Sequence, residues 1–240
     1  MVTLVLAVLL NYTAAWADDG FYVISVGGGV GTKISSVPYT IYSSGFYYLS
    51  GNLTYNGTDK AISISADNVT LDLMGFTVTG AGKTISTCGI YPNVNEATPS
   101  KNVEIRNGTV SGFNAGVVGA GADIRVSRIR AFNNTWGIWI SGGHTLVEGC
   151  TASNNWNGIQ VFSGRISGCV ARDNTGQGII LDGPGAVIGN VSNNNTTDGL
   201  ALHPQSPTPI MVDQNSADGN GTNYGSGSNT KIEWGVNAGR

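Results

Sequence analysis

The residues best suited to chemistry in this 240-residue chain are a carboxylate and an imidazole, Asp182 and His203. Each directly follows a repeated four-residue phrase, residues 178–181 in one case and 199–202 in the other. If the phrases are strands on successive coils, the side chains lie about 5 Å apart, so the carboxylate can orient the imidazole as a general acid or base. Asp beside Gly-Pro and His beside Pro are also ordinary turn residues, and a purely structural role stays open.

Aromatic side chains form a second candidate group. Trp136, Trp139, Trp156 and Phe162 fall within two repeats, and Trp139 and Phe162 are predicted to point outward. Flat exposed rings present apolar faces that suit sugar rings, which makes these four residues candidates for glycan binding. Shielding of a coil edge, or contact between two copies of the chain, would explain the same pattern.

Arginines supply a third group. Five of the twelve basic residues lie within three repeats, with Glu148 among them: Arg125, Arg128, Arg130, Arg165 and Arg172. Such a set could line a shallow groove for an acidic polysaccharide, because arginine binds carboxylates in a bidentate manner. Arg165 is accordingly added to the glycan-binding candidates. Solvated surface charge, with Glu148 pairing with a neighbour, is the alternative.

Internal repeats in the sequence predict the strands on which these residues lie. A phrase of Gly, an apolar residue, any residue and a second apolar residue recurs after 21, 20 and 21 residues, at 137–140, 158–161, 178–181 and 199–202. A period near 20 residues is typical of a solenoid. The alternation within each phrase predicts strands, and Gly and Asn at the ends disfavour helices. We therefore predict an all-β fold, a single-stranded parallel β-helix of about eight coils.

Stacked coils place equivalent residues in columns, and two inward columns are predicted from a second repeated phrase. They contain Ile129, Cys150, Cys169 and Asn190, and Ala131, Ala152, Ala171 and Ser192. Parallel Cβ vectors disfavour a disulfide between Cys150 and Cys169, so we expect two buried thiols. Asparagines recur where the chain must turn, which predicts left-handed backbone angles and hydrogen-bonded stacks of amides at Asn134, Asn155, Asn174 and Asn195.

Four segments are predicted along the chain. Residues 1–17 resemble a secretory signal peptide, 18–59 an aromatic-rich N-terminal cap with the first coil, 60–217 the β-helix, and 218–240 a Gly/Asn/Ser-rich tail. Loops are expected to project at 91–100, where the 34-residue interval exceeds one coil, and at 203–209, and both stretches contain prolines. The chain would then be secreted, in the periplasm or outside the cell.

The composition of the chain limits the classes of partner and cofactor that we expect. The net charge of −3 and the pI of about 5.2 give no electrostatic footprint for nucleic acid. No apolar stretch is long enough for a transmembrane anchor. Cysteine and histidine spacings match no metal site, so no cofactor is expected.

Residues 36–41, 44–53, 67–73 and 102–110 are similar to secreted bacterial right-handed parallel β-helix proteins of pectin-lyase-like architecture. The resemblance covers 21–222 and implies right-handed coiling. That architecture hosts polysaccharide lyases, hydrolases, phage tailspikes and adhesins, so it does not select an activity. Its lyases use acidic calcium ligands and a basic residue on one strand face, a set this sequence does not match; calcium is expected only if the chain is a lyase.

Three functions follow as hypotheses. The leading one is an exported, non-catalytic surface module that binds a polysaccharide or cell-surface glycan, or copies of itself as a homo-oligomer, through its aromatic face and projecting loops. The alternative is a polysaccharide lyase or glycoside hydrolase that acts on an acidic polysaccharide through Asp182 and His203. A purely structural assembly protein is the third. Low charge density favours the first, because lyases and hydrolases need clustered carboxylates or a base.

Overall fold

The computed structural model describes residues 31–83, 87–92, 100–203, 209–226 and 232–239. They belong to one compact unit, Gly31–Arg240. The predicted signal peptide and most of the two predicted loops lie outside the described residues, and those predictions stay untested.

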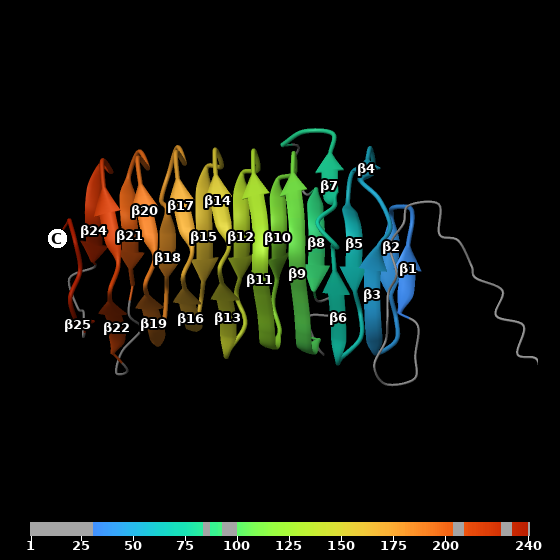
Figure 1. Ribbon diagram of the computed structural model, residues 1–240, viewed down its shortest axis with the longest axis horizontal. Helices are drawn as coiled ribbons and strands as arrows, with labels where there is room; N and C mark the ends of the chain where they lie inside the picture. The colour runs from blue at the N-terminus through green and yellow to red at the C-terminus, as the bar shows by residue number, and fades with distance from the viewer. Residues whose placement is uncertain (1–30, 84–86, 93–99, 204–208, 227–231, 240) are drawn as a thin grey trace, which may run out of the picture. The chain divides into compact units, whose positions relative to one another are not determined.

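Every regular element in the described residues is a β-strand, and all strand pairs are parallel. The strands form two sheets, and they follow one another along the solenoid in chain order (Figure 1). A first row of strands runs the length of the 16-stranded sheet: β1 Thr32–Ile34, β3 Gly45–Leu49, β6 Val69–Asp72, β9 Lys101–Ser111, β11 Ala122–Phe132, β13 Thr145–Glu148, β16 Gly164–Ser167, β19 Gly185–Ile188, β22 Ile210–Asp213 and β25 Ile232–Trp234.

A second row in the same sheet joins the first at β9 and β11, whose eleven residues span both rows. Its other strands are β4 Leu53–Tyr55, β7 Thr77–Gly80, β14 Thr151–Ser153, β17 Val170–Arg172, β20 Val191–Asn193 and β23 Ser216–Asp218. The third row is the nine-stranded sheet: β2 Tyr39–Ile41, β5 Lys60–Ile64, β8 Cys88–Pro92, β10 Ala115–Gly119, β12 Trp136–Ile140, β15 Asn157–Val161, β18 Ile179–Leu181, β21 Asp198–Leu202 and β24 Thr222–Ser226. Each coil contributes one strand to this row, so its nine strands agree with the predicted solenoid of about eight coils.

The register confirms the predicted columns. Ile138, Ile159, Ile179 and Leu200 face one another across the third row, and each is fully buried. Ala131, Ala152, Ala171 and Ser192 form the predicted inward column in the second row. Each coil therefore buries its apolar residues only against the coils on either side of it.

A ladder of buried asparagine amides closes the turn between the second and third rows. The Oδ1 of Asn155 accepts the backbone N–H of Asn134 at 2.9 Å, and the Oδ1 of Asn174 accepts that of Asn155 at 3.0 Å. Each Nδ2 also donates to a backbone carbonyl, as Asn155 does to Ala131 at 3.1 Å. The amide stack is confirmed, whereas the left-handed backbone conformation, predicted for the ladder asparagines themselves, was placed one residue too late. It belongs to the preceding residue, for example Asn133 and Asn154, each at φ 56.

The repeated glycine of the third row is explained by this ladder. A Cβ on Gly158 would lie 2.4 Å from the carbonyl oxygen of Gly178 and 3.0 Å from the Nδ2 of Asn174. Gly137 would meet Gly158 and Asn155 in the same way. Only glycine leaves room for the ladder amide and the next coil at this position.

A second ladder closes the turn between the first and second rows, and the predicted inward column containing the two cysteines is part of it. Asn215 accepts the backbone N–H of Asn190 at 3.0 Å, and Asn190 accepts that of Cys169 at 2.9 Å. Two coils beyond Asn190, the Sγ of Cys150 takes the place of the amide oxygen and accepts the N–H of Ile129 at 3.5 Å. Cys150 and Cys169 are both buried thiols, as predicted.

Strands also lie on both sides of residues 60–217, the predicted β-helix. Strands β1 to β4 lie within residues 18–59, which were predicted to hold the cap and the first coil, and they pair with later strands. Of the aromatic residues at 39–48 in this segment, only Tyr47 is buried. Residues 218–240, predicted as a Gly/Asn/Ser-rich tail, also contain strands. Strands β24 and β25 pair with β21 and β22, and Asn237 extends the second ladder to the last coil.

Candidate functional site

The aromatic surface, defined as Trp136, Trp139, Trp156 and Phe162, lies on the outer side of the third row. The ring centroids of Trp136 and Trp139 are 5.1 Å apart, and those of Trp136 and Trp156 are 5.2 Å apart at an interplanar angle of 80°. Trp139, Trp156 and Phe162 remain 37%, 49% and 46% exposed. The prediction that Trp139 and Phe162 point outward is confirmed, and the structure brings all three tryptophans together.

A polar trio, Gln160, Asp182 and His203, adjoins the aromatic surface. The Nδ1 of His203 lies 2.9 Å from the Oδ1 of Asp182, and the Nε2 of Gln160 donates to the other carboxylate oxygen at 2.5 Å. Asp182 is therefore held from both sides. The Oε1 of Gln160 is buried and has no partner among the described residues.

The backbone fixes where the trio sits. Gln160 is in register with Trp139 on the preceding coil and with Ile180 on the next. Hydrogen bonding between coils continues one residue past each strand, since the N–H of Asp182 donates to Val161 at 3.0 Å and that of His203 to Leu181 at 2.9 Å. Asp182 therefore lies between Phe162 and His203 in one outward column, and the aromatic and polar groups share one surface. The predicted proximity of Asp182 and His203 is confirmed, and their chemical role stays a prediction.

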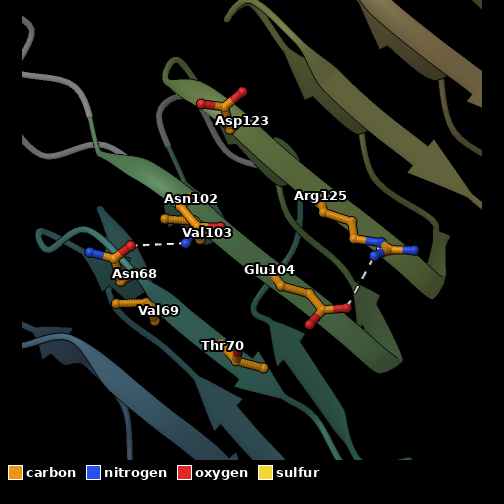
Figure 2. A pocket seen from close by; sticks show the side chains of 8 residues that line it. All are labelled: Asn68, Val69, Thr70, Asn102, Val103, Glu104, Asp123 and Arg125. Atoms are coloured by element: carbon orange, nitrogen blue, oxygen red, sulfur yellow. Dashed lines mark hydrogen bonds and ion pairs between the residues drawn. The ribbon is translucent and has the colours of Figure 1, made fainter.

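Charged side chains gather on a different surface, outside the first row. Glu104, Arg125 and Asp123 line part of a depression of about 220 Å³ over β6, β9 and β11. Figure 2 shows the side chains of Glu104 and Arg125 pointing toward each other, at 4.0 Å, and the amide of Asn102 donating to Asn68 at 2.9 Å. Asp123 lies at the other end of the depression, where it contacts His144 at 3.6 Å.

These charges neutralise one another in a chain of ion pairs. The buried carboxylate of Asp72 accepts from Arg106 at 2.8 Å, Arg106 contacts Glu104 at 3.2 Å, and Arg125 also binds Glu148 through its Nε at 2.9 Å. The hydrogen bond to Glu148 raises the pKa of Arg125. Because each member is already paired, this network stabilises the coils and leaves few charges for a ligand.

Sequence reasoning anticipated that Glu148 pairs with a neighbour but missed Asp72, Glu104 and Arg106. Asp72 is in register with Arg106 across 34 residues, whereas Glu104 is in register with Arg125 across the usual 21. The other arginines predicted to line one groove lie apart from one another. Arg172 pairs with Asp173 at 2.8 Å, and Arg128 and Arg130 lie near the turn between the first and second rows. Arg165 is exposed on β16, in the other sheet from the aromatic surface it was grouped with.

The described residues contain no group of three or more His, Cys, Asp or Glu side chains arranged to hold a metal ion. They also contain no helix with the length and apolar character needed to cross a membrane.

Comparison with known proteins identifies the fold family. The model of a family described as "Right handed beta helix region" matches residues 74–233, and the chain belongs to that family of right-handed parallel β-helices. Right-handed coiling, expected from the resemblance, is thereby confirmed.

Two solved structures are similar in fold. The A-module of the Azotobacter vinelandii mannuronan C-5 epimerase AlgE4 superposes with a TM-score of 0.61 at 13% identity, over 86% of this chain and 68% of that one. The Dettilon tailspike protein (gp208) superposes with a TM-score of 0.59 at 14% identity, over 80% of this chain and 42% of that one. No curated protein matches the sequence significantly.

Proposed function

We propose that this chain is an exported module that binds a polysaccharide on the outer side of its third row. The observation that carries the proposal is the cluster of three tryptophans, in which Trp136 packs against Trp139 and Trp156 and holds both partly exposed. Exposed aromatic clusters stack on the apolar faces of sugar rings, and rigid indoles lose little conformational entropy when they bind. The epimerase of similar fold acts on mannuronan, a polysaccharide, which supports a carbohydrate partner.

The polar trio supplies the second half of the binding surface. Sugar hydroxyls need hydrogen-bond partners at the edges of the ring, and Asp182 and His203 present an acceptor and an imidazole beside Phe162. Because both Gln160 and His203 hold the carboxylate, its position is set before a ligand arrives, which lowers the entropic cost of binding.

Retention on immobilised polysaccharides tests the proposal. The native chain is compared on a panel of neutral and acidic polymers with the variants Trp139→Ala and Phe162→Ala. The matched control is Phe132→Ala, which removes a ring of 42% exposure from β11 in the other sheet. We expect the first two variants to lose retention and the control to keep it. Equal retention by all four proteins, or no retention on any polymer, would refute the proposal.

A catalytic function is the second candidate, and the 2.9 Å contact between Asp182 and His203 favours it. A carboxylate that orients an imidazole is a common arrangement for general acid–base catalysis. The same polymer panel is followed for unsaturated uronates and new reducing ends, with and without calcium. Product that disappears in both Asp182→Ala and His203→Ala would establish a polysaccharide lyase or hydrolase at this site. Product that survives in both variants would place the chemistry elsewhere, and no product would leave the binding module.

A further inference from the structure

Two arginines at the turn between the first and second rows carry charge that no described residue neutralises. Arg128 and Arg130 are exposed and line a depression of about 260 Å³ together with Asn107, Gly75, Gly108 and Gly149. Arg106, Arg125 and Arg172 each form an ion pair, whereas Arg128 and Arg130 form none among the described residues. Two unpaired guanidinium groups at one depression produce a concentrated positive potential.

Both guanidinium groups are held in place by the preceding coil. The Nε of Arg128 donates to the Oδ1 of Asn107 at 2.7 Å, and the Nε of Arg130 donates to the hydroxyl of Thr109 at 3.0 Å. Asn107 is itself fixed, since its Nδ2 donates to the buried carboxylate of Asp72 at 3.0 Å. These anchors use one N–H of each group, so the four N–H bonds on the terminal nitrogens of each guanidinium stay available for a ligand.

Two glycines border the free space of the depression. A Cβ on Gly75 would meet nothing within 4 Å, so this position borders free space, and on Gly149 it would come within 3.7 Å of the Cγ of Arg128. Arg128 occupies the left-handed turn position, at φ 52, which Asn107 and Gly149 occupy on the coils to either side.

We propose that Arg128 and Arg130 form a binding site for an oxyanion, namely a carboxylate, sulfate or phosphate group. Planar guanidinium groups bind such groups through paired N–H donors, and two groups that converge on one depression satisfy several oxygens at once. The site lies in the other sheet from the aromatic surface, so its occupancy does not depend on that surface. The anion comes either from a charged polymer or from a free small ion.

Calorimetric titration distinguishes the sources. The probes are sulfated dextran, polygalacturonate and inorganic phosphate at constant ionic strength, with unmodified dextran as the neutral reference. The test variant is Arg128→Asn with Arg130→Gln, because asparagine accepts the left-handed backbone of position 128. The control is Lys101→Gln with Arg172→Gln, which removes two exposed positive charges elsewhere. Circular dichroism verifies that both doubly substituted chains are folded.

We expect the native chain to bind at least one anionic probe, and the test variant to lose about tenfold in affinity while the control loses less than about twofold. The probe that binds identifies the source of the anion. Arg128→Lys keeps the charge but not the planar fork, so its affinity should fall between the native chain and the test variant. Equal losses in the test variant and the control would mean diffuse electrostatic attraction and would overturn the proposal. Absence of binding to all three anionic probes would overturn it as well.

Discussion

The carboxylate of Asp182 contacts the imidazole of His203 although 21 residues separate them in the chain. The contact exists because both residues directly follow third-row strands that are in register, β18 and β21. With the Nδ1 of His203 turned toward Asp182, the Nε2 is the ring nitrogen left for a ligand. The chain thus places an oriented imidazole beside the aromatic surface.

Removal of this carboxylate should weaken polymer binding. In Asp182→Ala, both His203 and Gln160 lose a hydrogen-bond partner, and we expect the affinity for the retained polymer to fall about fivefold, the equivalent of roughly one hydrogen bond. Calorimetric titration measures the change. The control, Asp218→Ala, removes an exposed carboxylate from β23 in the other sheet and should bind like the native chain. Unchanged affinity in Asp182→Ala would exclude the trio from the binding surface.

The asparagine ladder should contribute strongly to stability. Asn155→Ala leaves the buried N–H of Asn134 without its acceptor and the carbonyl of Ala131 without its donor, so the free energy of unfolding should fall by about 3 kcal/mol. Urea denaturation provides the measurement. Asn154→Gly, at an exposed left-handed position next to the ladder, should change the free energy by less than about 0.5 kcal/mol. Similar losses in both variants would mean that turn conformation, rather than the amide stack, stabilises this corner.

Gly158 tests how closely the coils approach each other. An added methyl group has no space between Asn174 and Gly178, so Gly158→Ala should lower the free energy of unfolding by about 2 kcal/mol or more. Gly143→Ala adds the same methyl group where nothing lies within 4 Å, and it should leave stability almost unchanged. Thermal unfolding of the two variants side by side gives the comparison. A stable Gly158→Ala protein would show that neighbouring coils can move apart at low cost.

The cysteine column should accept asparagine. Asn190 donates to the carbonyl of Ile166, and the Sγ of Cys169 already lies 3.6 Å from the equivalent carbonyl of Val147. In Cys169→Asn the second ladder gains one more step, so we expect the protein to be at least as stable as the native chain. Cys169→Val fills similar space without the hydrogen bonds and should be less stable. The urea concentration at the midpoint of unfolding should be higher for Cys169→Asn than for Cys169→Val. A higher midpoint for Cys169→Val would contradict the equivalence of thiol and amide in this column.

Alkaline pH should destabilise the fold through Cys150. Its contact with the neighbouring thiol of Cys169, together with burial, raises the pKa of Cys150 above that of a free thiol. In the unfolded chain this thiol ionises at about pH 8.5, whereas in the folded chain it ionises only at higher pH. The stabilisation is therefore complete below the unfolded pKa and is lost as pH rises through the folded one. The free energy of unfolding, measured from pH 7 to 10, should fall less steeply in Cys150→Ala; identical slopes would contradict this assignment.

Sequence periodicity was sufficient to predict the solenoid, its inward columns, the amide stack and the proximity of Asp182 to His203, because each follows from a fixed offset of about 21 residues. It did not predict the ion pair of Asp72 and Arg106, because an offset, here of 34 residues, does not show which outward side chains bond. The left-handed turn residue was misplaced by one position, since Asn133 and Asn134 have the same side chain and only the backbone distinguishes their roles. The sequence also did not show that Arg165 faces away from the aromatic surface, on β16 in the other sheet.

Contacts between successive coils have a mechanical consequence. Asn134 and Asn155 are bonded across 21 residues, and similar bonds repeat along the solenoid. A chain pulled from its two ends should therefore not rupture all at once. It should unfold one coil at a time. Each step should release about 70 Å of extended backbone, the length of about 21 residues.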